Sequence, residues 1–406
     1  MNRYPGPSHG SAVHYDTEAD SSPSRRPALW PGSRGNPQWA VAALLLLLVG
    51  ASALQGQRRE FDVSPGGTLE LDLETGGSVK VTGWGSNTAQ VDAELSGRDR
   101  DDVELSFDQR GDRLVVRSRM RTERRRTEAS ANFVVQVPHR FSVVIDSSGG
   151  NIELHDLDGS FTGRTMGGQI DLSDLTGDVD LVTLGGNIEV ADSEVDGRVS
   201  TNGGNVDIRN VVGNLDGKSM GGNVRYADSR GARRGSDVVK VHTMGGRIEV
   251  PEALAGAELH TMGGPIRVGR AAGFVKAKTM GGSIEVEEID GWLELMTMGG
   301  DVTAVMVGDP SSGRRDVDIV SMGGDIHLVV PQGLEMEISI ELEFTRSHEG
   351  RHQIVSDFPV QIETSPERSR QKGSARKTMT ATGRIGSGAA KVTIRTVNGD
   401  VRLEKR

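Results

Sequence analysis

The chain contains no cysteine and few aromatic residues. Its 406 residues include no Cys and only 4% Phe, Trp and Tyr, whereas glycine occurs 55 times. The absence of cysteine excludes disulfides, thiolate metal sites, cysteine nucleophiles and a lipidated N-terminal cysteine. The scarcity of large side chains argues against an ordinary thick core and favours a repetitive fold with a narrow one.

The chain also lacks a basic charge balance and the motifs of common enzymes. Its formal net charge is -10, and nucleic-acid-binding proteins usually carry the opposite sign. No Ser/His/Asp order, phosphate-binding loop or His/Glu zinc pattern occurs on a suitable element. We therefore expect no nucleic-acid partner, no cofactor, no metal site and no enzymatic activity.

A predicted N-terminal targeting region precedes the part of the chain that is expected to fold. Residues 1–38 are rich in Pro, Ser, Gly and Arg and are predicted to form a disordered segment. Residues 39–54 (WAVAALLLLLVGASAL) would make about 24 Å of helix, which is short of the ~20 residues that span a bilayer. Ala51-Ser52-Ala53 has a small-x-small cleavage pattern, so a cleaved signal peptide is favoured over an uncleaved membrane anchor and over a buried core helix. The first two interpretations place the rest of the chain in the periplasm or at the cell surface.

A double glycine recurs at a fixed spacing after residue 148. Seven of the nine intervals have an 18-residue spacing and the other two have a 24-residue spacing, a pattern typical of stacked structural repeats. The glycines are expected to form sharp corners through positive φ or close backbone approach. The pairs are Gly149-Gly150, Gly167-Gly168, Gly185-Gly186, Gly203-Gly204, Gly221-Gly222, Gly245-Gly246, Gly263-Gly264, Gly281-Gly282, Gly299-Gly300 and Gly323-Gly324.

Each repeat holds two short runs in which apolar and polar residues alternate, as in Gly177 to Val190. Such runs predict strands with one buried face. The predicted fold is all-β, a parallel β-solenoid with one coil per 18-residue repeat. Right-handed winding is expected because crossovers between parallel strands prefer it. The predicted organisation is an irregular β cap with the first coils at 55–148, the regular solenoid at 149–331, and a β-rich excursion with a closing coil at 332–406.

Stacked coils place equivalent residues above one another, about 4.8 Å apart. An inward aliphatic column is predicted from Ile152 to Ile326, and a hydroxyl ladder before the corner from Thr165 to Ser321. An amide ladder, in which each side chain bonds to the next, is predicted for five successive coils. Its members are Asn151, Gln169, Asn187, Asn205 and Asn223.

Three segments carry a resemblance to a known family: Phe61–Ala93, Val135–Leu154 and Thr396–Val401. They are similar to parts of the bacterial "putative adhesin" family of β-strand-repeat proteins, also called toast-rack-like domains. The resemblance covers about residues 59–406. It implies an envelope-associated domain of unassigned biochemistry, sometimes linked to membrane segments or to envelope-stress sensing, and it implies no catalytic residues.

Two patterns raise the question of hard cations. A calcium β-roll needs Gly and Asp at the fourth and sixth positions of its unit, where this chain has residues such as Ile170 and Leu172, so that site is rejected. A column of stacked acids is expected to be a solvated face, with weak cation binding as the alternative. These acids are Glu153, Asp171, Glu189 and Asp207.

A methionine column and a histidine pair lie just before the glycines. Packing within the corner is the favoured interpretation of the methionines, with an exposed contact surface or a soft site for cuprous ion as alternatives. His242 and His260 are one repeat apart and should stack as a surface pair, since no third metal ligand shares their column. The methionines are Met166, Met220, Met244, Met262, Met280, Met298 and Met322, with Leu184 and Asn202 as exceptions.

The two six-residue insertions end in paired arginines, Arg233-Arg234 and Arg314-Arg315. The pairs are four coils apart, hence about 19 Å along one side. Insertions in repeat proteins often form the binding face, so these four arginines are the candidate partner-binding residues. With the basic runs Arg121–Arg126 and Arg368–Lys377 they could contact anionic envelope polymers, and ordinary solvated loops are the alternative.

The sequence thus predicts an exported, non-enzymatic, adhesin-like β-solenoid. Its expected partner is an envelope protein or an anionic envelope polysaccharide, with envelope sensing as one role, and it would contact the membrane only through an uncleaved residue 39–54 segment. A passive structural spacer and a carbohydrate-active β-helix enzyme are the alternatives. An enzyme would need acids and bases clustered in a groove, for which such short corners leave little wall.

Overall fold

The computed structural model describes residues 56–122, 128–228, 238–366 and 375–406. The chain divides into two units, Met1–Ala53 and Leu54–Arg406, and all that follows concerns the second. The predicted segments 1–38 and 39–54 lie outside the described residues. Within the described ranges the fold is all-β, with 28 strands, two 3-10 helices and no α-helix. No helix in these ranges is long and apolar enough to cross a membrane.

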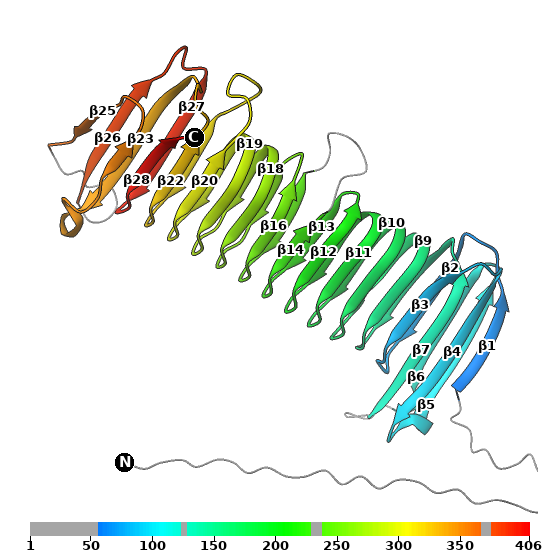
Figure 1. The fold of residues 1–406 in the computed structure, drawn as a ribbon. Coiled ribbons are helices and arrows are strands. Elements are labelled where there is room, and N and C mark those ends of the chain that lie inside the picture. The colour runs from blue at the N-terminus through cyan, green and yellow to red at the C-terminus, as the bar shows by residue number, and fades with distance from the viewer. Residues whose placement is uncertain (1–55, 123–127, 229–237, 367–374) are drawn as a thin grey trace, which may run out of the picture. The chain divides into compact units, whose positions relative to one another are not determined.

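Parallel strands build the regular middle of the fold, where they lie side by side in successive layers (Figure 1). Some layers are one long strand and others are two shorter ones. All pairings among these strands are parallel. The strands are β9 (Ile152–Thr165), β10 (Ile170–Thr183), β11 (Ile188–Thr201), β12 (Val206–Val212), β13 (Leu215–Ser219), β14 (Val224–Ala227), β15 (Val239–Thr243), β16 (Ile248–Ala253), β17 (Ala257–His260), β18 (Ile266–Lys278), β19 (Ile284–Thr297), β20 (Val302–Met306), β21 (Val317–Ser321) and β22 (Ile326–Val330).

The chain alternates between two walls. The first wall contains β12, β14, β16, β20, β22 and the first halves of the long strands, and the second wall contains β13, β15, β17, β21 and the second halves. In both walls the register joins equivalent residues, such as Ile170 with Ile188 and Leu181 with Val199. Across each insertion the register still holds, because Val224 pairs with Ile248 and Val302 with Ile326.

The predicted aliphatic column is confirmed and forms the core between the walls. Its members, from Ile152 through Ile248 to Val302 and Ile326, are at most 1% exposed. Residues of the second wall such as Leu181 and Val199 face them and are fully buried. Each fully buried aliphatic side chain stabilises the fold by about 1.5–3 kcal/mol, so every layer contributes to one continuous core.

The walls meet at two kinds of corner. One corner holds a residue with a left-handed backbone, φ between 50° and 57°, and an Asp or Asn occupies it in five successive layers. Asp and Asn tolerate this conformation better than other residues with a side chain. These residues are Asp156, Asp174, Asp192, Asn210 and Asp228.

The double glycines form the other corner, but for a different reason than positive φ. None of the paired glycines from Gly167 to Gly324, all of which are described, has a left-handed backbone. A Cβ on the second glycine Gly186 would lie 2.0 Å from the carbonyl oxygen of Gly168 in the preceding layer. The predicted close backbone approach is therefore the reason for glycine here.

Antiparallel strands are added at the N-terminal end. In the first wall β3 pairs in parallel with β7 and β9, and β4 and β1 follow antiparallel. In the second wall β8 pairs in parallel with β9, β2 with β8, and β6 with β2. β5 then pairs antiparallel with β6. The strands are β1 (Gly56–Asp62), β2 (Gly67–Leu73), β3 (Val79–Trp84), β4 (Thr88–Gly97), β5 (Val103–Arg110), β6 (Arg113–Met120), β7 (Ala129–Pro138) and β8 (Phe141–Ser147), with the short helix η1 (Arg100–Asp102) before β5.

The C-terminal segment rejoins the stack and ends it. Val317 pairs with Val392 and Ile326 with Val401, so β27 and β28 continue the second and first walls. Beyond them, β24 pairs in parallel with β28 in the first wall, and β23 pairs in parallel with β27 in the second. β26 then pairs antiparallel with β23, and β25 pairs antiparallel with β26. The elements are β23 (Met336–Thr345), η2 (Arg346–His348), β24 (Ile354–Ser356), β25 (Gln361–Thr364), β26 (Arg376–Arg384), β27 (Ala390–Val397) and β28 (Val401–Lys405).

Candidate functional site

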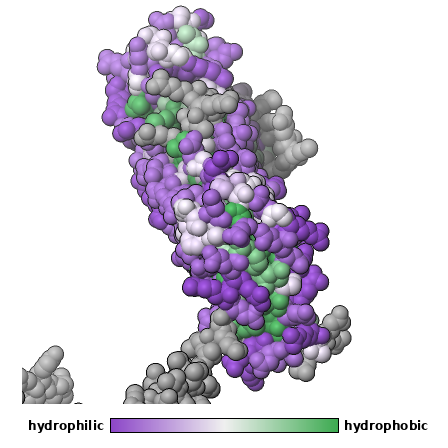
Figure 2. All heavy atoms as spheres, turned by 90° about the vertical axis from the view of Figure 1, so that its right-hand side faces the viewer, coloured by the Kyte–Doolittle hydropathy of each residue, from purple (hydrophilic) through white to green (hydrophobic). Residues whose placement is uncertain are grey.

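The most distinctive surface is a row of large apolar side chains at the glycine corner, which we call the methionine ridge. Its members are 43% to 55% exposed, so the prediction that they pack within the corner is wrong. On the face shown in Figure 2, hydrophobic residues are confined to a narrow band among hydrophilic ones. The ridge consists of Met166, Leu184, Met220, Met244, Met262, Met280, Met298 and Met322.

Buried hydroxyls fix the backbone that carries the ridge. Thr201 Oγ1 donates to the carbonyl of Gly186 in the preceding layer at 2.8 Å and accepts from the N–H of Gly204 in its own layer at 3.1 Å. Seven other members of the predicted hydroxyl ladder make the same two bonds, and each is thus a bridge between layers. They are Thr183, Ser219, Thr243, Thr261, Thr279, Thr297 and Ser321.

The ridge therefore sits on a rigid base. Residue n at the corner is buried and bonded twice, and residue n+3 is the glycine that touches the preceding layer. Residue n+1 is the exposed ridge residue, except in the layer of Thr201, where it is Asn202. Backbone bonds also join successive ridge residues, with Met262 N donating to Met244 O and Met280 N donating to Met262 O, both at 3.1 Å. The methionine side chains can change rotamer while their Cα atoms keep the spacing of the layers.

The histidine pair lies beside the ridge. His242 and His260 pair in the β15–β17 register, and their rings stack with centroids 5.9 Å apart, as predicted. Burial lowers the pKa of His242 below its ordinary value of 6.5, and the neighbouring Lys218 and His260 lower it further, whereas Asp216 opposes the shift. The ring of His242 is therefore uncharged at neutral pH.

The amide ladder differs from the prediction. Asn187 Oδ1 accepts from the backbone N–H of Asn205 at 2.8 Å, and Asn205 Oδ1 accepts from the backbone N–H of Asn223 at 2.8 Å. Gln169 instead donates to Asp171 in its own layer. The amides thus bond to the backbone of the next layer rather than to each other, which leaves them as layer bridges and not as free recognition groups.

The column of stacked acids is neutralised by neighbours. Glu153 pairs with Lys80 at 3.1 Å, Glu189 pairs with Arg209, and Asp207 lies 3.9 Å from Arg225. Asp171 accepts the bond from Gln169 described above. This arrangement is the solvated and internally balanced face that the sequence favoured.

Two of the four candidate arginines, Arg314 and Arg315, are described, and they are not offered together to a partner. Arg233 and Arg234 lie outside the described residues. Arg315 is only 5% exposed; its guanidinium donates to the carbonyls of Val307, Asp309 and Ser312 within its own loop and pairs with Asp290 at 2.6 Å. Such a buried and bonded group holds the insertion in shape and is not offered to a partner.

Arg314 is exposed but engaged. It pairs with Asp316 at 2.7 Å, and its guanidinium lies 4.3 Å from the ring centroid of Trp292. Trp292 in turn stacks on Phe274 at 5.1 Å, with Lys276 near the same ring. Sequence reasoning missed this aromatic and cationic cluster, although Phe274 and Trp292 are one repeat apart and pair in the β18–β19 register.

A second missed cluster joins the C-terminal excursion to the closing layer. His352 Nδ1 lies 3.1 Å from Asp400 Oδ1, and Asp325 Oδ1 accepts from the backbone N–H of Asp400 at 2.7 Å. Ligand-type atoms of these three residues lie within 4.8 Å of one another. The hydrogen bonds explain their closeness, because they attach the segment before β24 to the end of the first wall.

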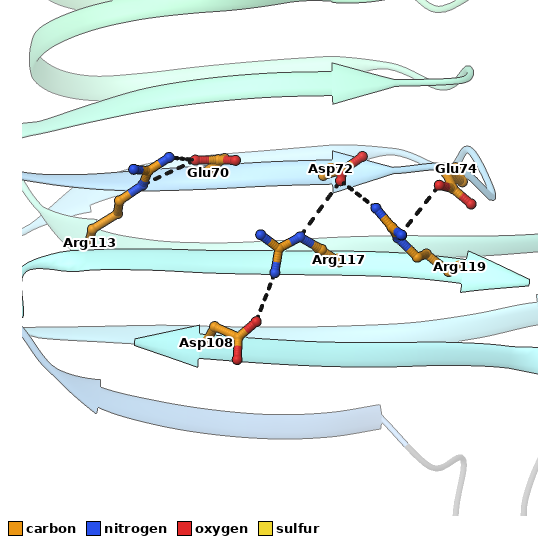
Figure 3. A network of polar contacts seen from close by, with 7 residues as sticks. All are labelled: Glu70, Asp72, Glu74, Asp108, Arg113, Arg117 and Arg119. Atoms are coloured by element: carbon orange, nitrogen blue, oxygen red, sulfur yellow. Dashed lines mark hydrogen bonds and ion pairs between the residues drawn. The ribbon is translucent and has the colours of Figure 1, made fainter. Parts of the chain in front are cut away.

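Charged residues near the N-terminal end also pair internally. Arg117 bridges Asp108 and Asp72, and Arg119 bridges Asp72 and Glu74, across β5, β6 and β2 (Figure 3). Exposed pairs of this kind contribute at most about 1 kcal/mol each. Their effect on function is to leave little unbalanced charge on this face.

A hollow with a volume of about 570 Å³ has an acidic lining. Arg270 lies 3.9 Å from Glu252 and 3.7 Å from Glu288, and Glu287 pairs with Arg267. Three carboxylates of the hollow, those of Glu252, Glu287 and Glu288, are thus held near arginine. This arrangement gives no support to the carbohydrate-active alternative.

Comparisons with known proteins agree in part with the family resemblance. No protein-family model and no curated protein matches the chain. Among solved structures it is similar to a putative cell adhesion protein from Clostridium sporogenes, with 9% identity, a TM-score of 0.20, and coverage of 87% of this chain and 100% of the other. It is also similar to a putative adhesin from Bacteroides fragilis, with 12% identity, a TM-score of 0.23, and coverage of 86% and 98%.

A third solved structure is a putative lipid binding protein from Parabacteroides distasonis. It shares 12% identity with a TM-score of 0.32, and the match covers 67% of this chain and 96% of the other. The first two descriptions are of the kind that the resemblance implied, and none of the three names an enzyme. At these identities and TM-scores the likeness carries no functional argument.

Proposed function

We propose that the chain is an extracytoplasmic, non-enzymatic binding scaffold, a right-handed parallel β-solenoid whose methionine ridge contacts a partner protein of the cell envelope. The observation that carries the proposal is the ridge itself, eight half-exposed apolar side chains in one row. Methionine suits a contact surface because its flexible, polarizable side chain adapts to irregular partners. The rigid base beneath the ridge keeps the row in place without restricting the side chains.

A partner protein is favoured over an anionic polymer by the charges. Many basic side chains of the outer columns already have acidic neighbours, as in Arg198 with Asp180, Arg164 with Asp146 and Lys278 with Glu294. Of the four candidate arginines, the two that are described are Arg315, which is buried, and Arg314, which is paired. An apolar strip between balanced charges complements another apolar protein surface better than a polyanion.

The size of the expected contact can be worked from the exposures. Met262 and Met280 are 43% and 48% exposed, so covering each would add about half of the ~1.5–3 kcal/mol that full burial of a methionine contributes. Together they would contribute about 2 kcal/mol, or about 30-fold in affinity. A lysine at either position would lose this gain and bring a charge into the interface.

The test compares a ridge variant with a matched surface variant. Photo-crosslinking in envelope fractions would identify a partner, which is then purified and its affinity for the full chain measured by biolayer interferometry. The double variant Met262→Lys/Met280→Lys should bind at least tenfold more weakly. Leu254→Lys replaces a side chain that is 51% exposed but off the ridge, and it should bind within twofold of the unaltered chain.

Three results would count against the proposal. Equal loss of binding in both variants would show that the ridge has no special role. Binding to isolated anionic polysaccharide with no protein partner would favour the polymer alternative. A chain that crosslinks to nothing in the envelope would favour a passive spacer.

The proposed location is tested separately, since it depends on residues 39–54, which lie outside the described part of the chain. Mass spectrometry of the mature protein should find a start near Leu54 if the segment is a signal peptide. An intact N-terminus in the membrane fraction would identify an anchor. Recovery of the intact chain from the cytoplasmic fraction would contradict both.

A further inference from the structure

We propose that Met244 and Met262 of the ridge, together with His242 and His260, bind a soft monovalent cation, Cu(I) or Ag(I). This proposal goes beyond the contact with a protein partner and does not depend on it. It rests on the spacing of the side chains, on their exposure and on the chemistry of the donor atoms.

The spacing of the layers suits one ion between two thioethers. Backbone bonds of 3.1 Å join Met244 to Met262 and Met262 to Met280, so successive side chains leave the backbone about 4.8 Å apart. Metal–sulfur bonds in protein sites are about 2.3 Å long, so two sulfur atoms on one ion lie up to ~4.6 Å apart. Neighbouring methionines can therefore share an ion without moving the backbone.

The histidine pair brings imidazole nitrogen to the same place. His242 precedes Met244 by two residues and His260 precedes Met262 by two, and the residue between them is buried in both layers. The buried Thr243 and Thr261 face the core, whereas the residues on either side of each are exposed. All four side chains are exposed, and the two rings stack at 5.9 Å. Two adjacent layers thus expose two thioethers and two imidazoles, two residues apart along each layer.

The donor set selects soft ions. Thioethers and imidazoles favour Cu(I), whereas Mg²⁺, Ca²⁺ and Mn²⁺ prefer carboxylate and carbonyl oxygen. The ridge and the histidine column between Lys218 and Lys278 contain no carboxylate, and both lysines are paired, with Asp216 and Glu294. No cysteine elsewhere in the chain offers a stronger soft ligand.

The column supplies its own control. Met166 is followed one layer on by Leu184 and preceded one layer back by Ser148, so it has no thioether neighbour. Leu184 also shows that leucine fits the column without disturbing the fold. Met→Leu substitutions therefore remove sulfur and keep shape.

The experiment titrates Ag(I), which does not change oxidation state, into the full chain by calorimetry in nitrate buffer, with Cu(I) measured by competition against bicinchoninate. Met244→Leu/Met262→Leu should weaken binding of both ions at least tenfold, and His242→Asn/His260→Asn should weaken it severalfold. Met166→Leu should leave it unchanged. Far-ultraviolet circular dichroism checks that each variant is folded.

Methyl NMR gives an independent readout. Ag(I) should shift the ε-methyl resonances of Met244 and Met262 and leave those of the fully buried Met306 and Met336 in place. Two results would overturn the proposal. One is a Met244→Leu/Met262→Leu chain that binds Ag(I) as tightly as the unaltered one, and the other is a Met166→Leu chain that loses as much affinity as the double variant.

Discussion

A single methyl group added to the second glycine of a corner should separate two layers, whereas the same methyl on the first glycine should be tolerated. In Gly186→Ala the new Cβ would lie 2.0 Å from the carbonyl oxygen of Gly168, 2.3 Å from its carbon and 2.6 Å from the nitrogen of Gln169. All three are backbone atoms, so no side chain can move aside. In Gly185→Ala the nearest atom is 3.7 Å away, an ordinary contact.

The size of the effect follows from what must move. Relieving the clash pushes the layer outward, which resembles overpacking of a core and costs about 1–3 kcal/mol. It also stretches the adjoining bonds from Leu184 N to Thr165 O and from Ile170 N to Asn187 O, each contributing about 0.5–1.5 kcal/mol. The free energy of unfolding should therefore fall by about 4 kcal/mol in Gly186→Ala. It should stay within about 1 kcal/mol in Gly185→Ala, where alanine also restricts the unfolded chain.

Guanidinium denaturation followed by far-ultraviolet circular dichroism measures both variants against the unaltered chain. Hydrogen exchange of peptides from the β10–β11 region shows whether the loss is local. Equal midpoints for the two variants would refute the reasoning, because their only difference is which glycine touches the layer below. A destabilised Gly185→Ala would show that the corner needs glycine for conformational freedom instead.

Three further predictions concern single side chains. Thr201→Val should lower the free energy of unfolding by about 2 kcal/mol or more because two buried backbone groups lose their partner, while Thr201→Ser should behave as the unaltered chain in the same denaturation assay. Arg315→Ala should raise hydrogen exchange throughout its loop, because the buried guanidinium holds that loop. Arg314→Ala should leave the exchange of the loop unchanged and alter the free energy of unfolding by less than about 1 kcal/mol. Equal exchange in the two variants would contradict the structural role of Arg315. NMR titration should give His242 a pKa below 6.5. The unfolded chain then binds the proton of His242 more readily than the folded chain does. The contribution of His242 to the free energy of unfolding is therefore fully present above pH 6.5 and falls as the pH drops below that value. A free energy of unfolding that stays constant between pH 5 and 7 would contradict the lowered pKa.

Much of the regular part of the fold could be predicted because the same pattern of apolar and polar residues recurs in every repeat. The fixed period of the repeats, with its alternating polarity, determines which residue faces inward, and Ile170 and Ile188 pair as that period requires. The positions of the hydroxyl ladder followed from the same argument, and the structure showed that these side chains are buried. The hydrogen-bond partners of the amide side chains could not be predicted in this way. Asn205 can bond either to a neighbouring side chain or to a backbone N–H, and only the distance between layers selects the backbone N–H.

The period, the inward columns and the positions of the corners can be predicted without coordinates, because each depends only on the order of residues along one coil. The tertiary structure was needed for four further features. Asp192 and its equivalents adopt the left-handed corner, antiparallel strands such as β1 and β25 end both walls, and Arg315 is buried while its neighbour is not. It also turned the ridge outward, since the direction of a side chain at a corner depends on how the backbone bends between two walls. Polarity alone could not predict that direction, because methionine is suited to either side.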